Sequence, residues 1–437
     1  MQTLVAPVSK PRSLRTNFSW TFIGNIVYAA CQWGMLIVIA KIGTPELVGQ
    51  FALGLAITAP VFMFTNMQMR AAQSTDAKRE YVFGDYLGVR LMSSVVALLM
   101  ITAITFVSGY RGATALIILI MGLAKGCESV SDVFYGLLQQ HERMDRVASS
   151  MMLKGGLSLA ALASAMYLTK SIVWALLCLT LTWVVTLLFY DARKALLTLQ
   201  EVAQHRLSSE RELQTEVIFK PRWSLKTTVR LLRLTFPLGM TMLLLSLNVN
   251  IPRYFIEHSL GSRQLGIYAA LSYLLVAEST VVSALGQAAG PRLSQYYAAH
   301  NTREFNLLSM RLLGLTGLLS TLAVVIVLLG GRPILRLLYS PEYAEHWQVF
   351  AWLVLAGGLW SIASILGYIA TACRRIKFQP VALTLVVLVS ILTSYLWIAR
   401  YGLSGVAAEE VVSAAFGVVG LVALTFPRST RRSTQTA

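Results

Sequence analysis

The chain has 437 residues, of which 56% are hydrophobic and only 13% are charged, and its mean hydropathy is +0.64. A soluble domain carries about 25% charged residues, so this composition excludes a soluble globular protein and indicates an integral membrane protein. The formal net charge of +17 is spread over many short segments. It is not gathered in one basic domain, so nucleic acid is not an expected partner.

Apolar runs of about 20 residues predict twelve membrane-spanning helices. The first follows three basic residues, Lys10, Arg12 and Arg15, as a signal peptide would. Its apolar run is long enough to span a membrane and lacks a cleavage site, so we expect an uncleaved helix. The expected spans are 18–40, 47–67, 87–108, 114–138, 147–168, 172–190, 231–251, 264–289, 307–330, 347–371, 379–399 and 404–426.

The distribution of Lys and Arg predicts the orientation. If the N-terminus is cytoplasmic, 28 basic residues fall on the cytoplasmic side, Lys154 among them, 8 fall on the opposite side, and Lys125 lies within a span. Cytoplasmic loops carry the excess of basic residues, so we expect both termini in the cytoplasm.

A long polar segment divides the chain into a lobe at 1–190, a linker at 191–230, a lobe at 231–427 and a tail at 428–437. The linker carries Trp223 and many basic residues, and parts of it favour a helix. Such a segment suits the anionic inner leaflet, although a plain tether between lobes explains it equally well.

The two halves share weak sequence similarity. VGQFALG at 48–54 matches LGIYAAL at 265–271, and YLGVRLM at 86–92 matches LLSMRLL at 307–313, which pairs Arg90 with Arg311. Six spans per half give both halves the same orientation. The sequence thus predicts an all-α membrane protein with two six-helix lobes and a central cleft between them.

The predicted fourth span carries charges. Lys125, Glu128 and Asp132 fall within an arc of about 60° on a helix, and Ser129, Gly136 and Gln139 extend that face. A charge at the bilayer centre costs roughly 2.5 kcal/mol or more, so these side chains must face protein or water. Two interpretations stay open: an ion pair that locks helices together, and the wall of a hydrated cavity.

Other polar residues within spans are candidates for the same cavity, although single Asn and Gln residues also join helices in membranes. Arg90 and Arg311 lie near span ends, where they could equally reach the headgroups. Glu409 and Glu410 begin the last predicted span, where a favourable helix-dipole interaction explains them. The further candidates are Asn25, Gln32, Asn248, Arg253 and Glu278.

No catalytic or cofactor motif occurs in the sequence. There is no GxSxG, Walker A, HExxH or glycine-rich dinucleotide fingerprint, and the four cysteines are scattered singly. We therefore expect no enzyme activity, no cofactor and no metal, and transport driven by a gradient or by the membrane potential.

Several segments together resemble the polysaccharide-transporter branch of the multidrug/oligosaccharidyl-lipid/polysaccharide superfamily. They are the N-terminal stretch SLRTNFSWTFIGNIVYAACQWGMLIVIAKIGTPELVGQFALGLAITAP, then ESVSDVFYGLLQQHERMD, and LLYSPEYAEHWQVFAWLVLAGGL at 337–359. One departure is Ser340, where the family pattern leads us to expect Gly.

This resemblance implies two lobes around a V-shaped cavity in a bacterial inner membrane. It implies a flippase that moves a polyprenyl-pyrophosphate-linked oligosaccharide for lipopolysaccharide or exopolysaccharide synthesis, with membrane lipids and polysaccharide assembly proteins as candidate partners. On this interpretation Lys125, Arg90, Arg253 and Arg311 contact the anion. Glu128, Asp132 and Glu278 position those cations or carry coupling protons.

Three alternatives remain. An ion-coupled exporter of drugs or small organic cations would favour a more acidic cavity. A polysaccharide polymerase or ligase would need a larger outer loop than the expected ones of about 15 residues near 252–263 and 331–346. A major-facilitator transporter would carry a compact Gly-Asp-basic motif, which MQMRAAQSTDAKREYVFGDY lacks.

Overall fold

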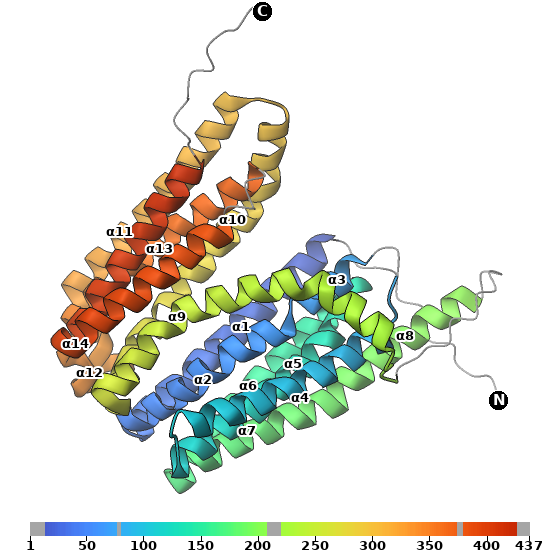
Figure 1. Ribbon diagram of the computed structural model, residues 1–437, viewed down its shortest axis with the longest axis horizontal. Coiled ribbons are helices and arrows are strands. Elements are labelled where there is room, and N and C mark those ends of the chain that lie inside the picture. Colours follow the sequence, from blue (N-terminus) through green and yellow to red (C-terminus); the bar gives the residue numbers. More distant parts are fainter. Residues whose placement is uncertain (1–13, 77–79, 208–219, 374–378, 426–437) are drawn as a thin grey trace, which may run out of the picture. The chain divides into compact units, whose positions relative to one another are not determined.

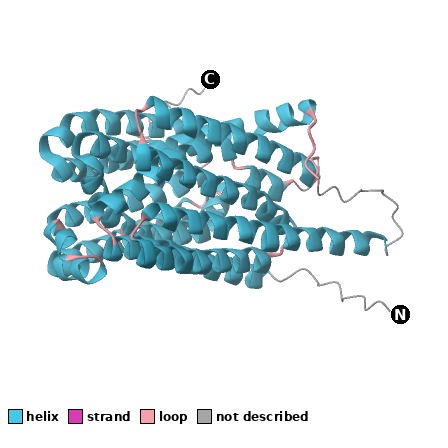
Figure 2. Cartoon of the chain, turned by 90° about the horizontal axis from the view of Figure 1, so that it is seen from below, coloured by secondary structure: helices cyan, strands magenta, loops and turns pink. Residues whose placement is uncertain are grey.

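The computed structural model describes residues 14–76, 80–207, 220–373 and 379–425, and these residues form helices and no strands (Figure 2). Ten stretches are long and apolar enough to cross a membrane. Two of them are interrupted by glycines with a positive φ, Gly261 (81°) and Gly402 (59°), a conformation that side chains disfavour. The helix breaks at each, so the described residues provide the twelve predicted crossings, and the predicted fold class is confirmed.

The chain divides into two compact units, Met1–Ser246 and Leu247–Ala437. In the first unit α5 is central and packs against α2, α3, α4, α6, α7 and α8 (Figure 1). The helices of this unit are α1 (Leu14–Ile42), α2 (Pro45–Asn66), α3 (Met69–Thr75), α4 (Phe83–Val107), α5 (Gly112–Gln140), α6 (Met144–Thr169), α7 (Ile172–Thr186), the π-helical turn η1 (Leu187–Asp191), α8 (Ala192–Leu207) and the first part of α9 (Leu225–Tyr273).

The second unit is organised around α13, which packs against α10, α11 and α14. Its helices are the rest of α9, α10 (Leu275–Ala298), α11 (Thr302–Leu338), α12 (Pro341–Glu345), α13 (Trp347–Ala372) and α14 (Gln379–Thr425). The prediction of outer loops of about 15 residues near 252–263 and 331–346 is wrong, because helices continue through most of both segments. Ser340 has an extended backbone (φ −146°), which requires no glycine.

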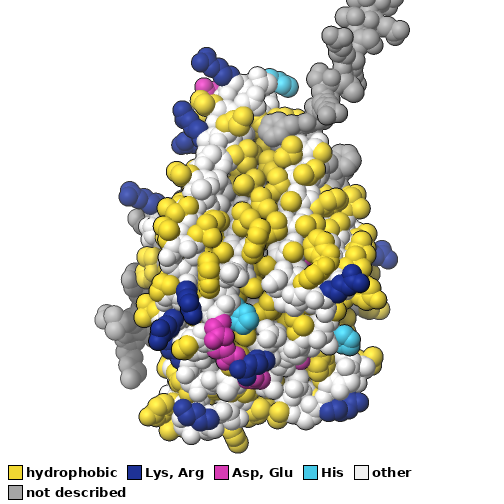
Figure 3. Space-filling model, turned by 90° about the vertical axis from the view of Figure 1, so that its left-hand side faces the viewer, with side chains coloured by type: hydrophobic (Ala, Val, Ile, Leu, Met, Phe, Trp, Pro, Cys, Tyr) yellow, Lys and Arg dark blue, Asp and Glu magenta, His cyan; other side chains and the backbone are white. Residues whose placement is uncertain are grey.

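The apolar side of α5 forms a core with α4. Val133, Phe134 and Leu137 are buried against Phe83 and Tyr86, and the rings of Phe83 and Phe134 lie 5.5 Å apart. The polar residues of α5 therefore lie on its other side, as their spacing predicts. Elsewhere many large hydrophobic side chains are exposed, and they cover much of the face seen in Figure 3, which suits contact with lipid.

The division between the units falls within α9, whereas the sequence places the lobe boundary in the linker. The start of α9 packs on the end of α2: the rings of Phe64 and Phe236 meet edge to face at 6.0 Å. Gln68 donates to the sulfur of Met242 (3.0 Å), and Gly239 lies against the carbonyl oxygen of Phe64. These contacts join the beginning of the seventh span to the first unit.

The C-terminal end of the linker packs closely against α4. The N–H of Arg222 donates to the carbonyl oxygen of Gly84 (2.8 Å). A Cβ atom on Gly84 would overlap the carbonyl of Lys220, and one on Gly88 would overlap that of Arg222. Two glycines one turn apart thus allow this approach of backbone to helix, so the linker is anchored at its C-terminal end.

We predict that Gly88→Ala destabilises the protein by about 1–3 kcal/mol, because the new methyl group meets a backbone carbonyl that cannot rotate away. Thermal unfolding of the purified protein in detergent measures the effect. Gly156→Ala is the matched control, since nothing lies within 4 Å of its Cβ position. Equal melting temperatures for the two variants would contradict the close packing of the linker backbone on Gly88.

Candidate functional site

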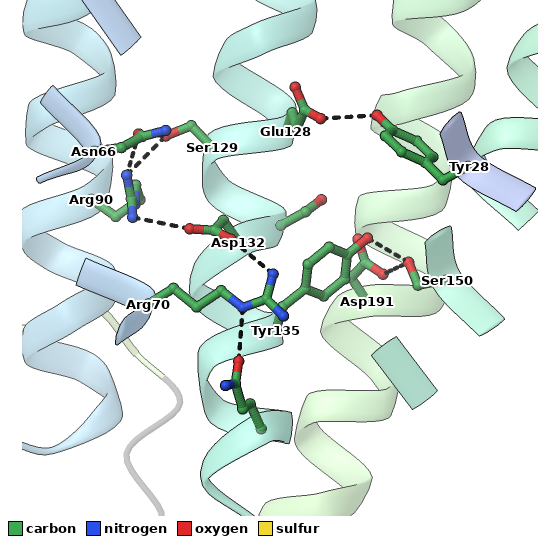
Figure 4. A network of polar contacts seen from close by, with 12 residues as sticks. Tyr28, Asn66, Arg70, Arg90, Glu128, Ser129, Asp132, Tyr135, Ser150 and Asp191 are labelled. Carbon is green, nitrogen blue, oxygen red and sulfur yellow. Dashed lines mark hydrogen bonds and ion pairs between the residues drawn. The ribbon is translucent and has the colours of Figure 1, made fainter. Parts of the chain in front are cut away.

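The polar face of α5 carries a chain of charged contacts (Figure 4). Lys125 Nζ lies 2.7 Å from Glu128 Oε2, and the hydroxyl of Tyr28 on α1 donates to Glu128 Oε1 at 2.9 Å. Lys125 also lies over the ring of Trp183 on α7, 5.5 Å from its centroid. The Lys125 and Glu128 side chains remain 25% and 31% exposed, so this pair is only partly buried.

Asp132, one turn further along α5, joins two arginines from neighbouring helices. Arg70 Nη1 on α3 lies 3.4 Å from Asp132 Oδ1, and Arg90 Nη2 on α4 lies 3.6 Å from Oδ2. Arg70 also donates to Gln139 through Nε (3.0 Å). The like-charge spacing of Glu128 and Asp132 is therefore offset by cations that come from outside α5.

Arg90 has no exposed side-chain surface. Its Nη1 donates to Asn66 Oδ1 at the end of α2 and to the hydroxyl of Ser129 (3.2 Å), which itself donates to Asn66 (2.5 Å). Arg90 thus joins α2, α4 and α5 inside the protein. The interpretation that it reaches out to lipid headgroups is wrong, because burial excludes it.

A second buried ion pair lies behind α5. Lys154 on α6 and Asp191 in η1 are 2% and 0% exposed, and Lys154 Nζ lies 3.4 Å from Asp191 Oδ2. Lys154 also donates to Ser131 (2.8 Å) and lies over the Tyr135 ring, while Ser150 donates to Asp191. Charges this deep in an apolar interior persist only when they are paired and hydrogen-bonded.

Sequence reasoning missed this second pair. It counted Lys154 among the cytoplasmic basic residues, although Lys154 lies seven residues inside the predicted span 147–168. That position within a span could have indicated that Lys154 is buried. Its partner could not be identified from the sequence, because Asp191 lies at the start of the segment assigned to the linker.

The other predicted site residues lie elsewhere. On α1, Asn25 is exposed, and Gln32 is half-buried beside Tyr28. The remaining four belong to the second unit and do not share one cluster. Arg253 donates to Asn250 (3.1 Å) and Ser320 donates to Glu278 (2.6 Å), whereas Asn248 is half-buried and Arg311 is exposed.

The site has the chemistry of ion pairing and anion contact. Within the described residues, no group of three or more His, Cys, Asp or Glu side chains is placed to hold a metal ion. The polar face of α5 instead presents a partly exposed lysine and a partly exposed arginine, Lys125 and Arg70, each paired with a carboxylate.

A family model described as "Polysaccharide biosynthesis protein" matches residues 14–297, well over half of the chain. The chain belongs to this family. It is also 29% identical over 402 residues to the capsular polysaccharide biosynthesis protein CapF of Staphylococcus aureus, a match that covers 91% of this chain and 95% of that one. The resemblance to polysaccharide transporters is thereby confirmed.

Solved structures share the fold of this polysaccharide biosynthesis protein. The lipid II flippase MurJ, in an inward closed conformation, superposes with a TM-score of 0.69 at 14% identity, covering 93% of this chain and 87% of MurJ. An inward-facing multidrug transporter of the MATE family gives 0.66 at 14% identity, covering 92% and 98%. At this identity the likeness concerns the fold alone.

We predict that Arg90→Met lowers the free energy of unfolding by about 3 kcal/mol, because it removes one of the two cations beside Asp132 and the hydrogen bonds from Arg90 to Asn66 and Ser129. Arg311→Met is the matched control, since Arg311 aligns with Arg90 in the repeat and is exposed. It should change stability by less than about 0.5 kcal/mol. Similar losses from both variants, measured by denaturant titration in detergent, would refute the structural role of Arg90.

We predict that substitutions of Lys154 and Asp191 have strongly non-additive effects on the free energy of unfolding. Lys154→Met alone strands a buried carboxylate and should cost about 3–5 kcal/mol, whereas adding Asp191→Leu should recover much of that loss. A double-mutant cycle on unfolding free energies measures the coupling. Additive losses would show that the two charges do not depend on one another.

Proposed function

We propose that this protein is a flippase that carries a polyprenyl-pyrophosphate-linked oligosaccharide across the bacterial inner membrane during surface polysaccharide synthesis. The observation that supports it most is the accessible polar face of α5, with membership of the polysaccharide biosynthesis family beside it. A lipid-linked substrate keeps its chain in the bilayer while its charged group needs a polar path. We assign no catalytic residue.

The accessible cations are candidates for contact with the pyrophosphate. Lys125 and Arg70 keep 25% and 29% of their side chains exposed, whereas Arg90 keeps none. We therefore propose Lys125 and Arg70 as binding residues and Arg90 as a residue that positions Asp132. Arg253, Arg311, Asn25, Gln32, Asn248 and Glu278 stay candidates for the remainder of the path.

Binding is proposed as an exchange of anions. In the unloaded protein Glu128 neutralises Lys125, and a phosphate oxygen takes its place when substrate arrives. The displaced carboxylate keeps the hydroxyl of Tyr28 as a donor. The cation is therefore never left unpaired in a low-dielectric region, which keeps the cost of loading small.

In the proposed orientation, both termini, the end of the linker that packs on α4 and the start of α9 are cytoplasmic. A surface hollow there is lined by Arg222, Lys226 and Arg230 together with Glu80 and Asp85. Its basic side chains suit the anionic inner leaflet, from which the substrate would be collected. Movement is then proposed to follow by alternating access, in which the polar path opens to each side of the membrane in turn.

Export in a deletion strain tests the proposal. Lys125→Ala, at matched membrane level, should lower surface polysaccharide at least tenfold and cause lipid-linked intermediates to accumulate, because the anion loses its main accessible cation. Lys125→Arg should restore part of the export. Lys170→Ala is the control, since Lys170 ends α6 and lies over an exposed tyrosine ring, Tyr167.

Wild-type export by Lys125→Ala would contradict the assignment of the site. The second candidate is an ion-coupled multidrug exporter, which the fold of the MATE transporter favours. Drug susceptibility distinguishes the two. A deletion strain that loses drug resistance but keeps its surface polysaccharide would support the exporter and exclude the flippase.

A further inference from the structure

A buried pair of carboxylates lies in the second unit, away from the polar face of α5. Glu409 and Glu410 are adjacent on α14, seven and eight residues after Gly402. The sequence interpretation, a favourable interaction with the helix dipole, does not fit this depth, because that interaction fades beyond the first turn. Another interaction must account for two acids inside a membrane-spanning helix.

Glu409 is almost completely enclosed, with 1% of its surface exposed. Its Oε1 accepts hydrogen bonds from Ser390 on the preceding leg of α14 (2.7 Å) and from Ser413 on its own leg (2.9 Å). Its Oε2 is buried and has no hydrogen-bond partner in the described structure. An ionised carboxylate would leave half of its charge unsolvated at that oxygen, at a high cost.

Glu410 has the opposite environment. Its Oε1 accepts from the hydroxyl of Tyr268 (2.7 Å) and its Oε2 from the indole N–H of Trp360 (3.4 Å). Arg253 on α9 lies close enough to act on it electrostatically. Both oxygens of Glu410 therefore have donors that would stabilise a negative charge, whereas Glu409 has donors at one oxygen only.

Among the described residues of the surrounding helices, several other titratable groups are exposed or contact other residues. On the first leg of α14, Tyr395, Arg400 and Tyr401 are exposed. On α13, Tyr368 packs over Gly286 of α10. On α9, Glu257 accepts from Ser262. Among the described residues, Glu410 acts electrostatically on Glu409, and Arg253 acts on Glu410.

Charge balance then determines the number of protons. Two ionised acids beside one arginine would leave a net negative charge in the membrane interior, whereas one bound proton makes the group neutral. We propose that Glu409 and Glu410 form a proton-binding site in which the proton resides on Glu409 Oε2 and Glu410 stays ionised opposite Arg253. The proton exchanges with water through Glu410, which is only half-buried.

Release of this proton would act on the helix itself. Ser390 and Ser413 lie on opposite sides of the break at Gly402, and both bond to the same oxygen of Glu409. A charged Glu409 would change the hydrogen bonds that join the two legs. We further infer that this step couples a proton gradient to transport; this part rests on the proposed function.

Infrared difference spectroscopy of the purified full-length protein tests the site without any transport assay. At neutral pH the wild type should show a protonated-carboxyl C=O band whose amplitude falls in Glu409→Gln. The band should persist in the matched control Glu342→Gln, which changes a half-buried acid of the same unit that is paired with Arg263. An unchanged band in Glu409→Gln would overturn the proposal.

A second variant keeps the test decisive if Glu409→Gln fails to fold. Ser413→Ala removes one hydrogen bond to Glu409 Oε1, so the C=O band should move to higher frequency while the acid remains. A band that does not move would also overturn the assignment to Glu409. Because neither result needs substrate, failure of the flippase proposal leaves this test intact.

The coupling is tested separately in vesicles that contain a fluorescent polyprenyl-pyrophosphate sugar. An imposed pH gradient should change the rate of movement at least several-fold for the wild type and not for Glu409→Gln. Equal responses of the two proteins would refute the coupling while leaving the infrared result standing.

Discussion

The structure of the first unit depends on one constraint: a charge in the membrane interior must have a partner of opposite charge within reach. α5 carries three charges, and each is paired. Lys125 meets Glu128, while Asp132 meets arginines from α3 and α4. The last two contacts join α3, α4 and α5, so the charges of α5 also determine which helices pack beside it.

The same network contains two kinds of charge with different roles. Arg90 and the Lys154–Asp191 pair have almost no exposed surface and hold helices in place. Lys125 and Arg70 are bound by carboxylates and still reach the surface. The contacts of Asp132 with Arg90 and Arg70 support the interpretation of the polar stripe as a helix lock, and the partial exposure of Lys125 is compatible with the proposed cavity wall.

Local sequence patterns predicted the features that depend on local geometry. The spacing of Lys125, Glu128 and Asp132 predicted a polar face, and the lengths of apolar runs predicted twelve crossings. Features that depend on distant partners could not be obtained in this way. The weak sequence match between the halves pairs Arg90 with Arg311, yet Arg90 is buried among Asn66, Ser129 and Asp132 whereas Arg311 is exposed. Likewise, Gly88 packs against the backbone of Arg222, which is far away in the chain. Glu409 accepts a hydrogen bond from Ser390, which lies before the helix break at Gly402.

The proposed function depends most directly on binding of the substrate's pyrophosphate by Lys125, the partly exposed lysine of α5. Direct binding of a polyprenyl pyrophosphate to the purified protein in lipid nanodiscs tests it most directly, with the corresponding polyprenyl alcohol as the uncharged comparison. The account predicts that Lys125→Ala weakens binding of the pyrophosphate at least tenfold, about 1.4 kcal/mol, and leaves binding of the alcohol unchanged. Equal affinity of the wild type and Lys125→Ala for the pyrophosphate would contradict the account.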